Sequence, residues 1–168
     1  MKGAHIIATH AELSLNGLYR WGLSRTVNRQ GKTAMWIGIN PSTADAELDD
    51  HSIRKLYGFG DLLGVRTWLV GNLCAFRATD VRELAKVEDP VGSSCDHYLA
   101  RMIERADLII AGWGKVDKLP RRLYGRPDEV LRLVRAAGKE MMCWGVNSDG
   151  SPRHPLMLSY ETQLEPWS

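Results

Sequence analysis

The sequence has little cysteine and no long apolar run, and these two absences exclude several classes of protein. Only three cysteines occur among 168 residues, and none forms a C-x-x-C pair. By themselves they cannot hold a structural zinc ion or a four-thiolate iron–sulfur cluster. No apolar run approaches the ~20 residues of a membrane span, and the first ten residues are too polar for a signal peptide. We therefore expect a cytoplasmic protein with reduced, buried thiols, no membrane partner and no cofactor.

An excess of charge of one sign is also missing. The 22 Lys and Arg residues nearly balance the 20 Asp and Glu residues, so the net charge is +2. This balance argues against a protein that coats nucleic acid by bulk electrostatics, although it allows a local basic patch. The length predicts one domain over residues 1–168, with a core from about residue 19 to residue 164, because domains typically have roughly 100–200 residues.

Short apolar runs and helical patterns alternate along the chain, which is typical of an α/β protein. The apolar runs are continuous, as expected for strands covered on both faces, and they are 34–39, 67–71, 108–112 and 141–145. Helical spacing of apolar residues follows three of them, in 53–63, 98–106 and 130–137. We predict a three-layer α/β/α sandwich with a mainly parallel sheet of four to five strands. The roughly alternating segment 19–25 predicts an edge strand beside the first buried strand.

Capping residues refine the helix boundaries. Asp80 with Glu83 predicts a further short helix, and Ser93 with Asp96 predicts an N-terminal cap for the helix over 98–106. Gly64 is at a position typical of a helix C-terminal cap, and Gly138 is at another.

Polar residues follow each of the four buried strands. The segments are 40–45 with Asp49 and Asp50 beyond it, 72–77, 113–115 and 147–155. Ligands of open parallel sheets bind beyond the carboxyl ends of the strands, so we expect these segments to meet at one cleft.

Each segment also has a purely structural interpretation. Asn40 and Ser42 are typical of turns and caps, Asp49 and Asp50 suit the first turn of a helix, and Trp113 suits a core. These interpretations would have to hold in all four segments at once. The joint occurrence of polar residues in all four segments therefore favours a shared site.

Seven motifs, in order, resemble a bacterial and phage family catalogued as domain of unknown function 1643. They are Tyr19-Arg20-Trp21-x-Leu23, 39–45, Asp49-Asp50-x-Ser52-Ile53-Arg54, Asn72-Leu73-x-Ala75-Phe76-Arg77-Ala78-Thr79, Asp89-Pro90-x-Gly92, 111–114 and 152–156. The family label implies no activity.

A fold-level resemblance extends further, to the uracil-DNA glycosylase superfamily and its mismatch-specific branch. The motifs that show this resemblance are Gly38-Ile39-Asn40-Pro41-Ser42, Asn72-Leu73, Trp113-Gly114-Lys115 and His154-Pro155-Leu156. The sequence departs from that superfamily after Ser42, and again after Pro155, where Leu replaces the usual Ser. The resemblance implies a nucleobase-recognising protein that hydrolyses the N-glycosidic bond of a modified or deaminated base. DNA is favoured over RNA as the partner, with a free nucleotide as an alternative.

On this hypothesis Asn40 positions water, Asp45 or Asp49 supplies negative charge or a general base, and His154 donates a hydrogen bond to the leaving base. Asn72 reads the base edge, an aromatic side chain stacks on it, and basic side chains hold phosphate. The expected substrate-binding residues are Pro41, Ser42, Thr43, Asp50, Arg54, Asn72, Phe76, Arg77, Trp113, Lys115 and Arg153.

Two other functions stay open at this point. One is a non-catalytic module that binds a nucleobase or nucleotide in the same pocket. The other is a metal-dependent nucleotide-processing enzyme in which Asp45, Asp49 and Asp50 bind a divalent cation.

Overall fold

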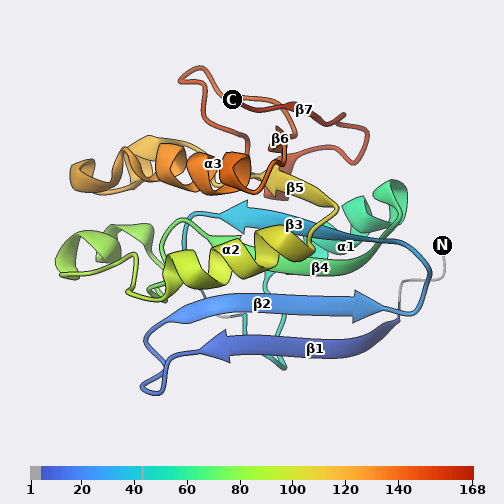
Figure 1. Ribbon diagram of the computed structural model, residues 1–168, viewed down its shortest axis with the longest axis horizontal. Helices are drawn as coiled ribbons and strands as arrows, with labels where there is room; N and C mark the ends of the chain where they lie inside the picture. Colours follow the sequence, from blue (N-terminus) through green and yellow to red (C-terminus); the bar gives the residue numbers. More distant parts are fainter. Residues whose placement is uncertain (1–4, 43) are drawn as a thin grey trace.

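The computed structural model describes residues 5–42 and 44–168, and these residues form a single mixed sheet flanked by helices (Figure 1). The described strands lie in the order β1-β2-β4-β3-β5-β6-β7. Their bounds are β1 Ile6–Leu13, β2 Arg20–Val27, β3 Lys32–Gly38, β4 Val65–Asn72, β5 Leu108–Ala111, β6 Met142–Cys143 and β7 Glu165–Pro166. The α-helices are α1 His51–Leu63, α2 Cys95–Arg105 and α3 Arg126–Ala136, and short 3-10 helices are η1 Val81–Lys86, η2 Val116–Lys118, η3 Arg121–Leu123 and η4 Pro155–Met157.

The sheet is mixed, which corrects the expectation of a mainly parallel sheet of four to five strands. β4, β3, β5 and β6 are parallel neighbours, whereas β1 with β2, β2 with β4, and β6 with β7 pair antiparallel. The described chain therefore has seven strands, and half of the neighbouring pairs are antiparallel. β1 leaves no apolar pattern in the sequence because most of its side chains are exposed, and β7 has only two residues.

The strand expected over residues 19–25 forms as β2, but it is not an edge strand. β1 covers its outer side, and its inner neighbour is β4 rather than β3, the next strand along the chain. This antiparallel pairing places the start of β2 beside the carboxyl end of β4. Arg20 and Asn72, which are far apart in the sequence, consequently lie at the same edge of the sheet.

Helices cover both faces of the sheet, as the continuous apolar runs predict. On one face α2 and α3 pack over alternate side chains of the central strands, including Met35 and Ile37. On the other face α1 packs over Trp36 and Trp68. Because β3 is buried on both faces, its sequence is continuously apolar rather than alternating.

The predicted helices are confirmed, with one correction at a cap. Gly64 ends α1 in the left-handed conformation at φ 66°, and Asp80 caps η1 by accepting a hydrogen bond from the Arg82 amide. The residue at the N-terminal cap of α2 is Ser94, not Ser93, and its side chain makes no capping hydrogen bond. Residue 93 precedes the cap because α2 begins at Cys95.

The three cysteines are free and buried, as expected. Burial raises the pKa of Cys74 to about 12 and that of Cys95 to about 11. Both thiols are therefore protonated and unreactive at neutral pH.

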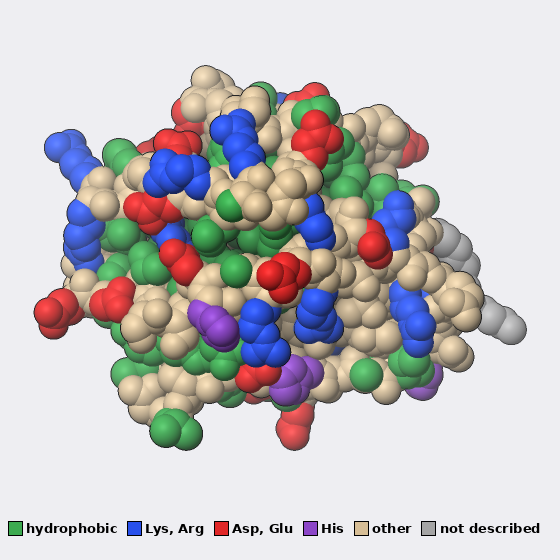
Figure 2. Space-filling model, viewed as in Figure 1, with side chains coloured by type: hydrophobic (Ala, Val, Ile, Leu, Met, Phe, Trp, Pro, Cys, Tyr) green, Lys and Arg blue, Asp and Glu red, His purple; other side chains and the backbone are tan. Residues whose placement is uncertain are grey.

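Two surface properties concern possible partners. Within the described residues, no helix combines the length and the apolar character that crossing a membrane requires. On the face that α2 and α3 cover, acidic and basic side chains are interspersed (Figure 2). This face therefore has no broad patch of one charge.

Candidate functional site

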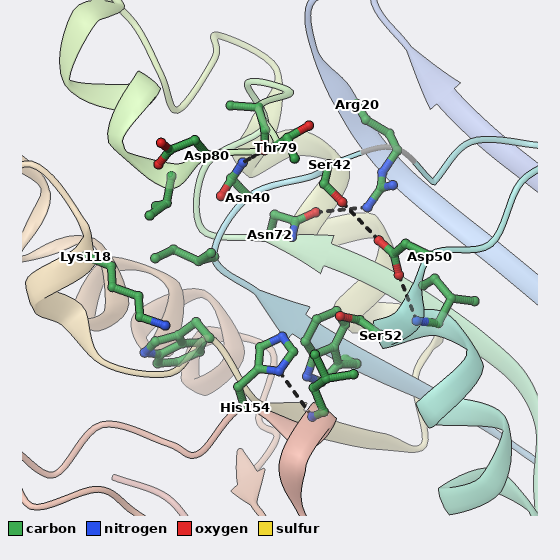
Figure 3. A pocket seen from close by; sticks show the side chains of 17 residues that line it. Arg20, Asn40, Ser42, Asp50, Ser52, Asn72, Thr79, Asp80, Lys118 and His154 are labelled. Carbon is green, nitrogen blue, oxygen red and sulfur yellow. Dashed lines mark hydrogen bonds between the residues drawn. The ribbon is translucent and has the colours of Figure 1, made fainter.

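A cavity of about 510 Å³ lies at the carboxyl ends of β3, β4 and β5 (Figure 3). All four polar segments that follow the buried strands contribute to it. Its lining includes both polar and aromatic side chains: Arg20, Trp36, Ile39, Asn40, Ser42, Asp50, Ser52, Ile53, Asn72, Ala78, Thr79, Asp80, Val81, Trp113, Lys118, His154 and Leu156. Six of the residues expected from the sequence are among them, namely Asn40, Ser42, Asp50, Asn72, Trp113 and His154.

Asn72 is held with its amide nitrogen toward the cavity. It is the last residue of β4 and is 5% exposed. Its Oδ1 accepts a hydrogen bond from Arg20 Nη2 at 3.4 Å. A guanidinium group only donates, so this contact fixes which end of the amide is which and leaves Nδ2 to donate to a ligand.

The end of β3 must be glycine for Asn72 to lie where it does. A Cβ atom on Gly38 would lie 3.0 Å from Asn72 Nδ2 and 2.8 Å from the Trp36 ring. Both distances are shorter than ordinary van der Waals contact. Gly38 thus makes room for the side chain that the next strand places in the cavity.

Asn40 presents the opposite end of its amide. Its Nδ2 donates to the carbonyl oxygens of Ala78 at 2.8 Å and Pro41 at 3.0 Å. Both hydrogens of Nδ2 are therefore used, and Oδ1 is the atom left to contact a ligand or a water molecule. Asn40 and Asn72 lie on one side of the cavity, and His154 lies across from them (Figure 3).

His154 is a neutral hydrogen-bond donor. Its Nδ1 accepts from the Leu156 amide at 3.2 Å, which places the ring proton on Nε2. Burial, followed by the positive charge of Lys118, lowers the pKa of His154 to about 4, although Asp50 opposes the shift. The ring is therefore neutral at neutral pH, and the edge of the ring packs against Trp36 at 5.5 Å between centroids.

Asp50 is a carboxylate in the wall of the cavity, and it also caps α1. Its Oδ1 accepts from the Ile53 amide at 2.9 Å, and its Oδ2 accepts from Ser42 Oγ at 3.1 Å. Both oxygens are thus oriented, and a negative charge stands at the cavity wall.

Arg20 is a buried cation at the same wall, only 3% exposed. Its Nη1 donates to the Ala44 carbonyl at 2.5 Å and its Nη2 to Asn72, while its Nε has no partner among the described residues. Burial lowers the pKa of Arg20 to about 10, with Asp50 opposing the shift, and the side chain is still charged at neutral pH. Arg20 was not among the site residues expected from the sequence, although it belongs to one of the family motifs.

The two acids expected to be catalytic do not line the cavity. Asp49 Oδ1 is paired with Arg25 Nε at 2.7 Å, and its Oδ2 accepts from the Tyr57 hydroxyl at 2.7 Å. Asp45 Oδ1 accepts from the amides of Glu47 and Leu48, and these hydrogen bonds lower the pKa of Asp45. Both carboxylates are used to shape the loop between β3 and α1.

All three expected phosphate ligands, Arg77, Lys115 and Arg153, also lie outside the lining, and so does Arg54. Arg77 Nη1 donates to the Gly17 carbonyl and Arg54 Nη2 to the Asp49 carbonyl. Arg153 Nε donates to the Val146 carbonyl, and Lys115 is exposed. Lys118, three residues beyond Lys115, is the lysine that lines the cavity.

Three further residues that were expected at the site are not among the described residues that line the cavity. Phe76 packs edge-on against Tyr19 at 5.6 Å between centroids, outside the cavity. Pro41 is buried, and its carbonyl accepts from Asn40. Thr43 is outside the described residues. Of the two expected stacking aromatics, only Trp113 lines the cavity.

The acidic segment before α1 does not form a metal site. Among residues 5–42 and 44–168, no group of three or more His, Cys, Asp or Glu side chains is placed to hold a metal ion. The reason is that both carboxylates already have other partners. Asp45 accepts from the backbone of its own loop, and Asp49 accepts from Arg25 and Tyr57.

The fold and cavity define an α/β protein with a polar cavity at the carboxyl edge of its sheet. Residues 20–156 match the model of a family described as a protein of unknown function (DUF1643), and the chain belongs to this family. The match starts at Arg20 and ends at Leu156, both of which line the cavity. Searches of curated proteins and of solved structures found no match.

Proposed function

We propose that the cavity binds a single nucleobase and that the protein hydrolyses the N-glycosidic bond of a modified or deaminated base in DNA, as proteins of the uracil-DNA glycosylase superfamily do. The observation that carries this proposal is the placement of three polar atoms around one cavity. Asn72 Nδ2 and His154 Nε2 are donors, and Asn40 Oδ1 is an acceptor. A cavity of about 510 Å³ is within the usual range for small-ligand sites.

The base is the part of the substrate that the two donors suit. Pyrimidines and purines that have been deaminated carry a ring carbonyl where the parent base carries an amino group. A carbonyl oxygen accepts from Asn72 Nδ2, whereas an amino group would face it donor to donor. Trp113 forms part of the cavity wall, but it is 1% exposed and belongs to the core, so it offers a base little stacking surface.

The reaction needs water, a leaving-group donor and negative charge near the sugar. Water held by Asn40 Oδ1 adds at C1′, the bond from C1′ to the base nitrogen breaks, and its electron pair leaves with the base. His154 Nε2–H donates to the departing base. Asp50, rather than Asp45 or Asp49, is the one of the three acids before α1 that lines the cavity, and its charge favours the oxocarbenium-like sugar. The proton of the water is released to solvent.

A non-catalytic reader of nucleobases is the second candidate, and one observation favours it. Both oxygens of Asp50 already accept hydrogen bonds, and Asn40 is not a base. Asp80, the other carboxylate of the described lining, accepts hydrogen bonds from Arg82 at both oxygens. Each of these carboxylate oxygens therefore already has a partner, which predicts a slow enzyme or a pure binding protein.

Oligonucleotides carrying uracil, hypoxanthine or an enlarged pyrimidine test the proposal. We expect alkali-labile strand breaks at one of these bases with the wild type, and a loss of roughly 100-fold or more in Asn40→Ala, since positioning and acid–base groups contribute about that much. Asn147→Ala is the matched control, because Asn147 bonds to Ser151 outside the cavity.

Thermal unfolding of both variants shows whether Asn40→Ala retains its fold. Unchanged turnover in a folded Asn40→Ala variant refutes the role of Asn40. Tight binding without breaks identifies the second candidate instead. Breaks that require added magnesium or manganese contradict the proposed mechanism and favour a metal-dependent enzyme.

A further inference from the structure

Arg20 differs from the other deeply buried arginines of the described chain in lacking a carboxylate partner. Arg25 pairs with Asp49, and Arg126 pairs with Asp96 and Glu129. The hydrogen-bond acceptors of Arg20 are the neutral oxygens of Ala44 and Asn72. A buried charge without a counter-ion costs several kcal/mol, so this arrangement is unusual for a purely structural residue.

The charged side chains around Arg20 do not supply the missing counter-ion. Asp50 and Asp45 attract it, and Arg77 and Arg25 repel it. Asp45 is held by the amides of its own loop, and Arg25 is already neutralised by Asp49. Asp50 is therefore the main counter-charge, and it lies beyond ion-pair distance, because no carboxylate of the described residues comes within 4.0 Å of Arg20.

We propose that Arg20 makes the inner end of the cavity an anion-binding subsite that takes the nucleobase in its deprotonated, negatively charged form. This inference rests on the proposed function and deepens it. When the glycosidic bond breaks, the electron pair stays on the ring nitrogen and spreads onto the adjacent carbonyl oxygens. Asn72 Nδ2 donates to that oxygen, while Arg20 donates to Asn72 Oδ1 and polarises the amide toward the base. Arg20 is thus a positioning residue that acts through Asn72.

The same chemistry implies a property of the free product. A base released from the sugar equilibrates between its neutral form and its anion by losing an N–H proton to solvent. A site that stabilises the anion binds it more tightly than the neutral base, so affinity rises as pH passes the N–H pKa of the ligand. A phosphate group is the other anion that could occupy the subsite.

Calorimetric titration between pH 6 and pH 9 with two matched pairs of free bases tests the subsite. The pairs are 5-fluorouracil with uracil, and xanthine with hypoxanthine. In each pair the first base is the stronger acid. 5-Fluorouracil differs from uracil by one fluorine atom, and xanthine differs from hypoxanthine by one ring carbonyl. We expect the affinity for the more acidic base to rise by roughly tenfold or more over this range, which corresponds to one pKa unit of anion stabilisation. The affinity for its partner should rise less and at higher pH, because a smaller fraction of the weaker acid is ionised over this range. Arg20, with a pKa of about 10, and His154, with a pKa of about 4, hold their charge states across most of this range.

Three variants separate the role of Arg20 from a general loss of structure. Arg20→Gln retains a donor to Asn72 but loses the charge, so it binds the neutral bases and shows no rise with pH. Arg20→Lys retains the charge and recovers part of the rise. Arg132→Gln removes an exposed arginine of α3 and behaves as the wild type.

The outcomes that overturn the inference are distinct from those that overturn the proposed function. Equal affinity for the acidic and neutral base of each pair, at every pH, overturns the anion subsite and leaves base recognition intact. Equal affinities at every pH, together with displacement of uracil by inorganic phosphate, assign the subsite to phosphate and also overturn the inference. If none of the four bases binds at any pH, the proposed function itself is contradicted, and the inference with it.

Discussion

Two buried arginines on one strand have opposite surroundings. Arg25 and Arg20 both belong to β2, they are 1% and 3% exposed, and both donate to carbonyl groups in the loop before α1. Arg25 also has a carboxylate partner, Asp49, whereas Arg20 has none and faces the cavity. A buried cation that is neutralised within the protein is explained by the fold. A buried cation without a carboxylate partner at a cavity wall points to a ligand.

An irregularity of the strand explains how both guanidinium groups reach the same loop. They are five positions apart, and in a regular strand an odd difference in position places side chains on opposite faces. The pairing of β1 with β2 shifts at Trp21, because Glu12 pairs with Gly22 and Leu13 with Arg20. A bulge of this kind turns a side chain to the other face, and bulges are frequent beside active sites.

The largest expected effect is the loss of stability on removing the paired arginine. Arg25→Met leaves the partly buried carboxylate of Asp49 without its cation, which we expect to lower the free energy of unfolding by about 3 kcal/mol. Arg20→Met leaves two neutral acceptors without donors and no unpaired carboxylate, so we expect a loss of no more than about 2 kcal/mol.

Urea denaturation of both variants measures this difference. The distinction between the two arginines would be lost if Arg20→Met proved as destabilising as Arg25→Met. Arg25→Lys serves as a control, because it retains the charge beside Asp49 and should lose less stability than Arg25→Met.

The next effect is the dependence of stability on pH that His154 causes. The pKa of His154 is about 4 in the folded protein and 6.5 in an ordinary histidine. Between these values the unfolded chain binds a proton that the folded protein does not, so stability falls as pH drops from about 7 to about 4 and this contribution is constant below that. We expect about 2 kcal/mol from this group.

Urea denaturation of His154→Gln at pH 7 and at pH 4 isolates the contribution. The variant should lose less stability on acidification than the wild type, by the amount that His154 causes. An identical pH dependence in both proteins would show that the ring is not neutral and buried as described.

The smallest expected change in stability compares two neighbouring acids. Asn caps helices as well as Asp does, and the negative charge of Asp50 is beyond ion-pair distance from Arg20, so Asp50→Asn should lower the free energy of unfolding by only about 1 kcal/mol. Because it removes the main negative charge near Arg20, it should also tighten binding of a base anion severalfold.

Asp49→Asn should change stability rather than affinity, because Asp49 pairs with Arg25 and lies outside the cavity. It should lower stability and leave the affinity for the base anion unchanged. Titration with 5-fluorouracil at pH 9 measures the affinity of both variants. Similar behaviour of the two variants would mean that Arg20 and Arg25 share one charge network.

The fold was predictable where burial leaves a periodic signal. The runs that became β3, β4 and β5 are apolar throughout because helices cover both faces, and α1 to α3 each show helical spacing. β1 has no such signal, since it lies at the edge with most side chains exposed. The number of strands and the antiparallel part of the sheet therefore did not follow from the sequence.

The site was predictable only to the level of segments. Parallel strands end at one edge, which is why the loops carrying Asn40, Asn72, Trp113 and His154 meet. The choice between Asp49 and Asp50 depends on which one caps α1 and which one meets Arg25. The position of Arg20 depends on a bulge, and neither feature is encoded in local spacing.

The most direct test of the account is the response of side-chain amide signals to a free base in ¹H–¹⁵N NMR spectra. Adding uracil or hypoxanthine should shift the Nδ2 resonances of Asn72, whose amide is turned toward the cavity, and leave those of Asn147 unchanged. Saturable binding of the base without any shift at Asn72 would contradict the claim that this cavity recognises a nucleobase.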